Sequence, residues 1–132
     1  MKILLSIKPE FVEQIFKGKK KFEYRKSIFA NHEVSSVVIY STMPVGRIVG
    51  EFSISQVLMD TPEQIWRDTK QKSGITKTFY DLYFENRNKA YALEIGELTE
   101  YKTPINPYEL IDGFVPPQSF RYLNENSILI NN

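Results

Sequence analysis

The order in which the apolar residues change their spacing constrains this chain more than any other feature. An apolar stretch over residues 2–7 suits a short strand, and Lys8-Pro9 follows it, where proline at a first helical position begins a helix. Apolar residues then recur at helical spacing until Gly18. The spacing next becomes that of strands, and it predicts three of them, over residues 20–28, 37–40 and 47–58.

The third of these strands changes parity along its length. Ile48, Phe52 and Ile54 fall on one face, whereas Val57 falls on the other. A bulge near Ser55 or Gln56 would bring both sets to one face, and curved sheets often contain such bulges.

The second half of the chain predicts a helical insertion, one more strand and a helical tail. Thr61-Pro62-Glu63-Gln64 has the layout of a capping box, so we expect a helix that ends by Gly74. A second helix is expected from about Thr76 to before Asn88, then a strand at 91–95, and short helices at 107–111 and 117–123. This order predicts an α+β fold dominated by sheet, for which a small barrel is the natural closure.

Composition narrows the class of protein. The chain has 132 residues, 42% of them apolar, and neither a repeat nor a linker-like stretch, so we expect one domain over residues 1–132. Cysteine is absent and His32 is the only histidine, which argues against thiolate metal sites, histidine-pair catalysis and any metal or cofactor. The apolar run at the N-terminus is too short for a signal peptide or a membrane span, so we expect a cytoplasmic protein.

Residues 18–25 carry the motif that points to a site. They read Gly-Lys-Lys-Lys-Phe-Glu-Tyr-Arg, which matches the pattern GxKxxExR. In a strand, Glu23 and Arg25 project from one face about 7 Å apart, and Lys20 joins them if regular pairing begins after it. Together the two cations would attract a phosphate, and the carboxylate would accept a hydrogen bond from the amino group of a base; both interactions are typical of nucleotide recognition. The alternative is a salt-bridge set that closes the mouth of a barrel.

Other candidate ligand-binding residues lie where predicted elements begin or end. Lys8 adds positive charge at a helix start, Ser41 and Thr42 follow a strand, and the predicted last helix would place three more residues at its N-terminus. These three residues are Gln118, Ser119 and Tyr122. The alternatives are a lysine that only reaches toward solvent for Lys8, a capped turn for Ser41 and Thr42, and a helix cap for the serine of the last helix.

The motif and several other segments resemble the ASCH domain, a branch of the PUA-like superfamily. The similarity extends to residues 6–11, 49–51, 90–92 and 116–120, and it is greatest to a prokaryotic subgroup labelled predicted transcriptional regulators. The resemblance implies a PUA-like small β-barrel with surrounding helices. ASCH relatives include an amidohydrolase that deacylates acetylcytidine and a protein with ribonuclease activity.

Three functions follow from the residues and the resemblance. The first is a module that binds RNA, a nucleotide or a nucleoside in a charged pocket around the motif, with a regulatory role left open. The second is a small amidohydrolase or ribonuclease with Lys20 and Glu23 as candidate catalytic residues. The amidohydrolase lysine aligns with Lys20, but its threonine nucleophile aligns with Glu23, so Ser41 or Thr42 would have to supply the hydroxyl. The third is a protein-interaction domain.

Overall fold

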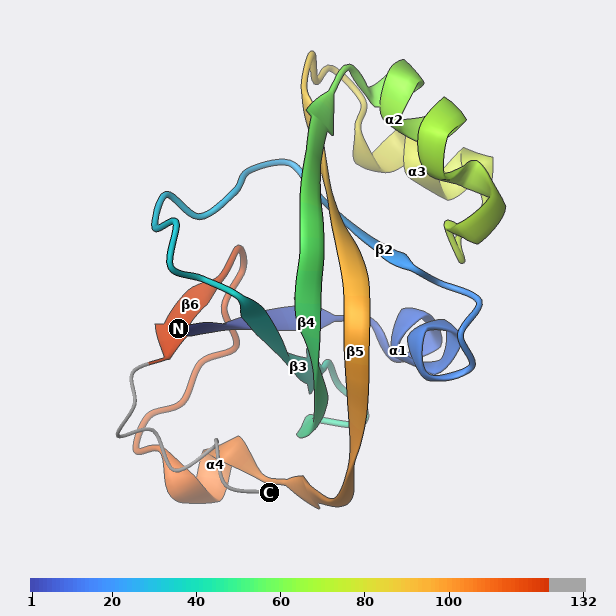
Figure 1. Ribbon diagram of the computed structural model, residues 1–132. Coiled ribbons are helices and arrows are strands. Elements are labelled where there is room, and N and C mark those ends of the chain that lie inside the picture. The colour runs from blue at the N-terminus through green and yellow to red at the C-terminus, as the bar shows by residue number, and fades with distance from the viewer. Residues whose placement is uncertain (124–132) are drawn as a thin grey trace.

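The computed structural model describes residues 1–123, and its framework is one mixed sheet of six strands with helices packed around it (Figure 1). In chain order the elements are β1 (Lys2–Ile7), α1 (Pro9–Phe16), β2 (Phe22–Arg25), β3 (Ser36–Ser41), β4 (Arg47–Asp60), α2 (Pro62–Thr69), the 3-10 helix η1 (Lys70–Lys72), α3 (Lys77–Tyr83), β5 (Ala90–Ile105), α4 (Pro107–Leu110) and β6 (Arg121–Leu123).

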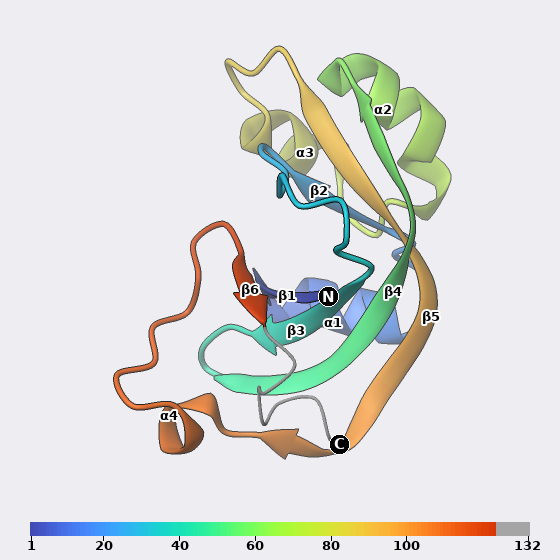
Figure 2. The same cartoon turned by 60° about the vertical axis from the view of Figure 1, so that its left-hand side comes forward.

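The strands lie in the order β2-β5-β4-β3-β1-β6, and only β1 and β3 run parallel. The long strands β4 and β5 curve around β3 and β1, and β2 pairs with β5 at one end of the sheet (Figure 2). The α+β fold is therefore confirmed. The sheet is not closed into a barrel, because β2 and β6 form no ladder with each other.

Irregular pairing between β4 and β5 produces this curvature. Their register shifts between Ile54 and Gln56, as the change of parity predicted, and also between Ile48 and Gly50 and between Phe52 and Ile54. Each shift leaves extra residues on one strand, three on β5 at Ile48/Gly50 and one at each of the other two places, and such residues bend the strand and increase its twist. Curved in this way, the sheet brings its two ends toward each other.

The helices begin where the capping residues predicted. Pro9 is the first residue of α1, whose Val12 and Ile15 are buried against the sheet. The side-chain oxygen of Thr61 accepts from the backbone N–H of Gln64, and Thr76 caps α3 in the same way through Phe79. The helix α2 ends at Thr69, before the predicted Gly74, and η1 fills the interval.

The predicted helix over residues 117–123 is wrong. Arg121, Tyr122 and Leu123 form β6, which pairs antiparallel with Lys2–Leu4 of β1. The open edge of β1 offers these three residues backbone partners on one side, and Leu123 is buried there. Tertiary pairing has overridden a weak local preference for helix.

Candidate functional site

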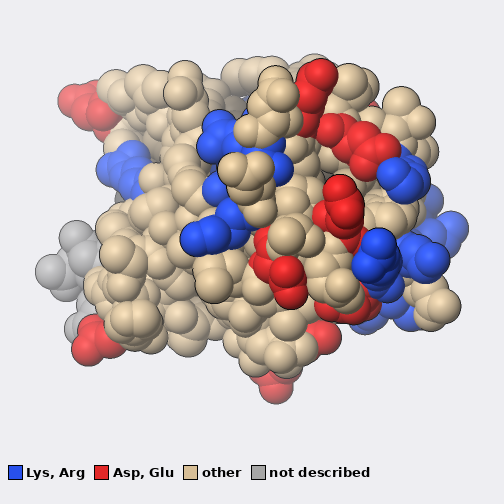
Figure 3. Space-filling view, turned by 90° about the horizontal axis from the view of Figure 1, so that it is seen from above, with Lys and Arg blue, Asp and Glu red and all other residues tan. Residues whose placement is uncertain are grey.

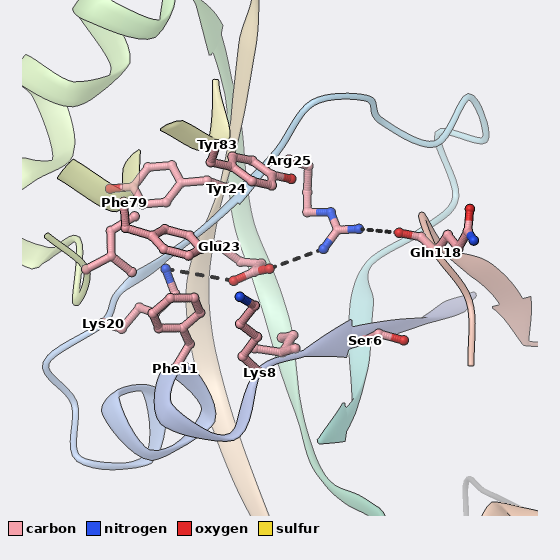
Figure 4. A pocket seen from close by; sticks show the side chains of 12 residues that line it. Ser6, Lys8, Phe11, Lys20, Glu23, Tyr24, Arg25, Phe79, Tyr83 and Gln118 are labelled. Carbon is pink, nitrogen blue, oxygen red and sulfur yellow. Dashed lines mark hydrogen bonds and ion pairs between the residues drawn. The ribbon is translucent and has the colours of Figure 1, made fainter. Parts of the chain in front are cut away.

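A pocket of about 290 Å³ lies between the two ends of the curved sheet (Figure 4). Its walls come from β2, from the junction of β1 with α1, from α3 and from the segment that precedes β6. Its polar side chains are Ser6, Lys8, Lys20, Glu23, Arg25 and Gln118, and its aromatic ones are Phe11, Tyr24, Phe79 and Tyr83. The three charged residues of the motif thus line one hollow.

Glu23 lies between two cations of the motif. One carboxylate oxygen is 3.8 Å from Lys20 Nζ and the other is 3.4 Å from Arg25 Nη1 (Figure 4). Glu23 and Arg25 project from the same face because they are two residues apart in β2. Lys20 reaches the same carboxylate because β2 begins only at Phe22, so the chain is still turning when it passes Lys20.

Lys20 is an almost completely buried lysine. Only 2% of its surface is exposed, its Nζ donates to the Ser73 carbonyl over 3.1 Å, and it lies 4.6 Å from the centre of the Tyr24 ring. Burial lowers the pKa of Lys20, and the neighbouring Glu23 only partly opposes this shift. This amine therefore loses its proton more readily than an ordinary lysine does.

Gly74 allows the chain to pack this closely around Lys20. Its φ is +66°, and a Cβ placed there would lie 2.3 Å from Lys20 Cβ. Sequence reasoning assigned this glycine only to the end of a helix. Its second role depends on contact with a residue more than 50 positions away, which no local pattern reveals.

Aromatic rings form the wall opposite the motif. Phe11 of α1 and Phe79 of α3 meet edge to face with centroids 4.9 Å apart, and Lys8 Nζ lies 5.0 Å from the centre of the Phe79 ring. Tyr83 lies one turn beyond Phe79 on the same face of α3. The sequence predicts the helix that carries Phe79 and Tyr83 but not their place in the pocket wall, because core and pocket rings have the same helical spacing.

Arg25 connects the two ends of the sheet. Its Nη2 donates to the Ser119 carbonyl over 2.7 Å, and the Gln118 carbonyl lies 3.5 Å from the same nitrogen. Gln118 consequently lines the pocket, whereas Ser119 meets Arg25 only through its backbone. Tyr122 lies in β6 with its hydroxyl 3.4 Å from the Asn31 backbone N–H, outside the pocket lining. The helix N-terminus once expected at these three residues does not exist.

Ser41 and Thr42 lie away from the pocket. Ser41 is buried at the end of β3 and lines a different hollow, beside α1 and β5. Thr42 stands in the turn that follows, where its carbonyl accepts from the Val45 N–H. The structure therefore does not bring either hydroxyl to Lys20.

Two further features concern the described part of the chain. Among residues 1–123, no three His, Cys, Asp or Glu side chains gather as a metal site would require. No helix in this range is long and apolar enough to cross a membrane.

This geometry defines the class of protein. It is an α+β domain in which a charged pocket with aromatic walls lies between the two ends of a strongly curved, open sheet. The chain belongs to the ASCH domain family, whose sequence pattern matches residues 5–99.

Relatives and a solved structure agree with this assignment. The chain is 28% identical over 125 residues to the "ASCH domain-containing ribonuclease" of Zymomonas mobilis, covering 92% of this chain and 84% of that one. The crystal structure of an ASCH protein from Zymomonas mobilis superposes with a TM-score of 0.86 at 27% identity, over 94% of this chain and 88% of that one. The large ribosomal subunit protein uL22 of Ureaplasma parvum serovar 3 is 30% identical over 123 residues. That match covers 92% of this chain, which spans only 39% of the length of the Ureaplasma protein.

Proposed function

We propose that this protein binds RNA through a single nucleotide, or binds a free nucleotide or nucleoside, in the pocket around Lys20, Glu23 and Arg25. The observation that carries the proposal is the convergence of these three side chains on one hollow with aromatic walls. Cations that attract phosphate and rings on which a base stacks are the two components that single-stranded RNA sites combine.

Each part of the pocket matches a part of a nucleotide. Lys8 is exposed at the rim and the Arg25 side chain is 14% exposed, so both can reach a phosphate at the pocket mouth. The Glu23 carboxylate can accept from an exocyclic amino group, as carboxylates accept from the amino group of cytosine. Phe79 and Tyr83 present ring faces near the same hollow.

The named relatives support an RNA ligand. The Zymomonas mobilis relative is called a ribonuclease, and the Ureaplasma relative is a ribosomal protein. Reversible binding without turnover would suit the regulatory role that the subgroup label suggests.

Paired lysine variants test the pocket. Lys20→Met removes the buried amine, and Lys21→Met removes an exposed one that does not line the pocket. We expect Lys20→Met and Arg25→Ala to weaken binding of short RNA or nucleotides, measured by fluorescence anisotropy or calorimetry, while Lys21→Met binds nearly as wild type does. Thermal unfolding shows that each variant is folded. Equal affinities for Lys20→Met and Lys21→Met would overturn the proposal.

A ribonuclease is the second candidate function, favoured by the lowered pKa of Lys20 beside Glu23 and by the name of the Zymomonas relative. In such a reaction, neutral Lys20 would take the proton of a 2′-hydroxyl as its oxygen attacks the adjacent phosphorus. The P–O5′ bond would break to leave a 2′,3′-cyclic phosphate, and the leaving 5′-oxygen would take a proton from water. Cleavage of RNA that Lys20→Met abolishes and Lys21→Met retains would establish this activity. Intact RNA after prolonged incubation with the wild type would exclude it.

The amidohydrolase alternative has less support, because neither Ser41 nor Thr42 lines the pocket. Release of acetate from acetylcytidine by the wild type would restore it.

A further inference from the structure

A second hollow, of about 590 Å³, lies between α2 and α3. Phe79 and Tyr83 of α3 line the pocket described above. Tyr80 and the adjoining Phe84 line this groove, so α3 separates the two hollows. Figure 3 shows blue side chains interspersed with red ones at the right-hand side of the molecule, on the side where Figure 1 places α2 and α3. We call this hollow the α2–α3 groove.

The cations of the α2–α3 groove are mostly unpaired. The side chains of Arg67, Lys70 and Arg87 are exposed and form no hydrogen bond or ion pair with any residue in the range 1–123, whereas Lys77 pairs with Asp81 over 2.7 Å. Four cationic side chains line the groove against two acidic ones, Asp81 and Glu63. Exposed cations that have no carboxylate partner remain available to an anionic ligand.

An aromatic platform lies among these cations. Trp66 is half-buried in the groove lining, and its ring packs against Tyr80 with centroids 4.7 Å apart and planes at 46°. Tyr80 and Tyr24 hold each other edge to face beneath it. A half-buried ring that packs against a second ring and is flanked by Arg and Lys is an arrangement on which bases of a single strand can stack.

Positive charge also connects the groove with the pocket. Burial raises the pKa of the Tyr83 hydroxyl; the positive charges of Arg25 and Arg87 oppose this shift, whereas the carboxylate of Glu23 adds to it. Lys26 Nζ lies 4.6 Å from the centre of the Tyr83 ring. Cationic side chains therefore follow one another from the pocket, past Tyr83, to the groove.

We propose that the α2–α3 groove binds the sugar–phosphate backbone of a single RNA strand, one nucleotide of which occupies the pocket. This inference rests on the proposed function and adds the path of the rest of the strand. RNA fits better than an acidic polypeptide because the groove pairs its cations with a supported indole ring next to a nucleotide-sized pocket.

The test compares ligands of two lengths on two matched double variants. Arg67→Ala/Lys70→Ala removes two unpaired groove cations, and Lys17→Ala/Lys102→Ala removes two exposed lysines that line neither the groove nor the pocket. Anisotropy is measured with a labelled single-stranded RNA of about ten nucleotides and, by competition, with nucleoside monophosphates. Circular dichroism confirms that both variants are folded.

We expect the groove variant to bind the longer RNA about tenfold more weakly at roughly 0.15 M salt. The slope of log K against log salt should fall by about 0.7 for each cation removed, hence by about 1.4 for two. Monophosphate binding should not change, because the pocket is intact. The control variant should retain most of the wild-type slope.

The remaining outcomes separate the groove from the pocket. If the two double variants have the same RNA affinity and the same salt slope, the proposal that RNA binds in the groove is overturned. If the groove variant loses RNA affinity while Lys20→Met and Arg25→Ala do not, RNA binding in the groove is supported and the proposed function of the pocket is overturned. Polyglutamate that binds the groove more tightly than RNA would identify an acidic polypeptide as the partner and overturn the inference.

Discussion

Gly74→Ala should destabilise the protein by about 2–5 kcal/mol, because two separate costs act at this position. The left-handed backbone, with φ at +66°, costs an alanine roughly 1–2 kcal/mol. The new Cβ would also lie 2.3 Å from Lys20 Cβ and 2.9 Å from Lys20 Cα, and overpacking of this kind costs about 1–3 kcal/mol. Lys20 cannot avoid the contact by changing rotamer, since its Cα and Cβ are among the atoms that overlap.

Gly113→Ala is the matched control. Gly113 has φ at +65°, but nothing lies within 4 Å of a Cβ placed there, so only the backbone cost of about 1–2 kcal/mol applies. Urea unfolding of wild type and both variants gives the two losses of free energy directly. The excess for Gly74→Ala measures the overlap with Lys20. Equal losses would refute the claim that Gly74 is required by its contact with the buried lysine.

Three further predictions concern residues of the pocket. Burial lowers the pKa of Lys20 below its ordinary value of 10.5, so between the lowered pKa and 10.5 the unfolded chain binds more protons than the folded one, and stability rises with pH. Urea titrations at several pH values should show this rise in the wild type and not in Lys20→Met. Tyr24→Phe should cost about 1 kcal/mol, since it removes the buried bond to Thr69 over 2.7 Å and keeps the ring; an unchanged urea midpoint would contradict this. Arg25→Ala should speed amide hydrogen exchange in β6, because the bond to the Ser119 carbonyl is lost, and unaltered exchange there would show that this bond does not hold the segment.

The parts of the site that are close in sequence could be predicted. The spacing of Glu23 and Arg25 sets their common face, and the helix signals at Pro9 and Gly18 place the turn that carries Lys20 beside them. The parity change in β4 likewise predicted the irregular pairing near Gln56. These features depend on local geometry, which the order of residues determines.

The parts that depend on long-range pairing could not be predicted. Residues 121–123 became a strand because β1 had an open edge, and sequence spacing gave no sign of that edge. The strand expected over 91–95 is the 16-residue β5, since β4 pairs with it as far as Ile105. Ser41 is the last residue of β3 and Thr42 begins the turn after it, close to the predicted strand end, but neither residue lines the pocket that contains Lys20.

The incomplete closure of the sheet creates the space for the pocket. A fully sealed barrel of small size fills its interior with side chains and leaves little room for a ligand. Here β2 and β6 form no hydrogen-bonded ladder with each other, and Arg25 spans the gap between them through hydrogen bonds to the backbone carbonyls of Gln118 and Ser119. A ligand bound in the pocket would contact β2 on one side and the segment before β6 on the other, so binding would stabilise the two ends of the sheet relative to each other.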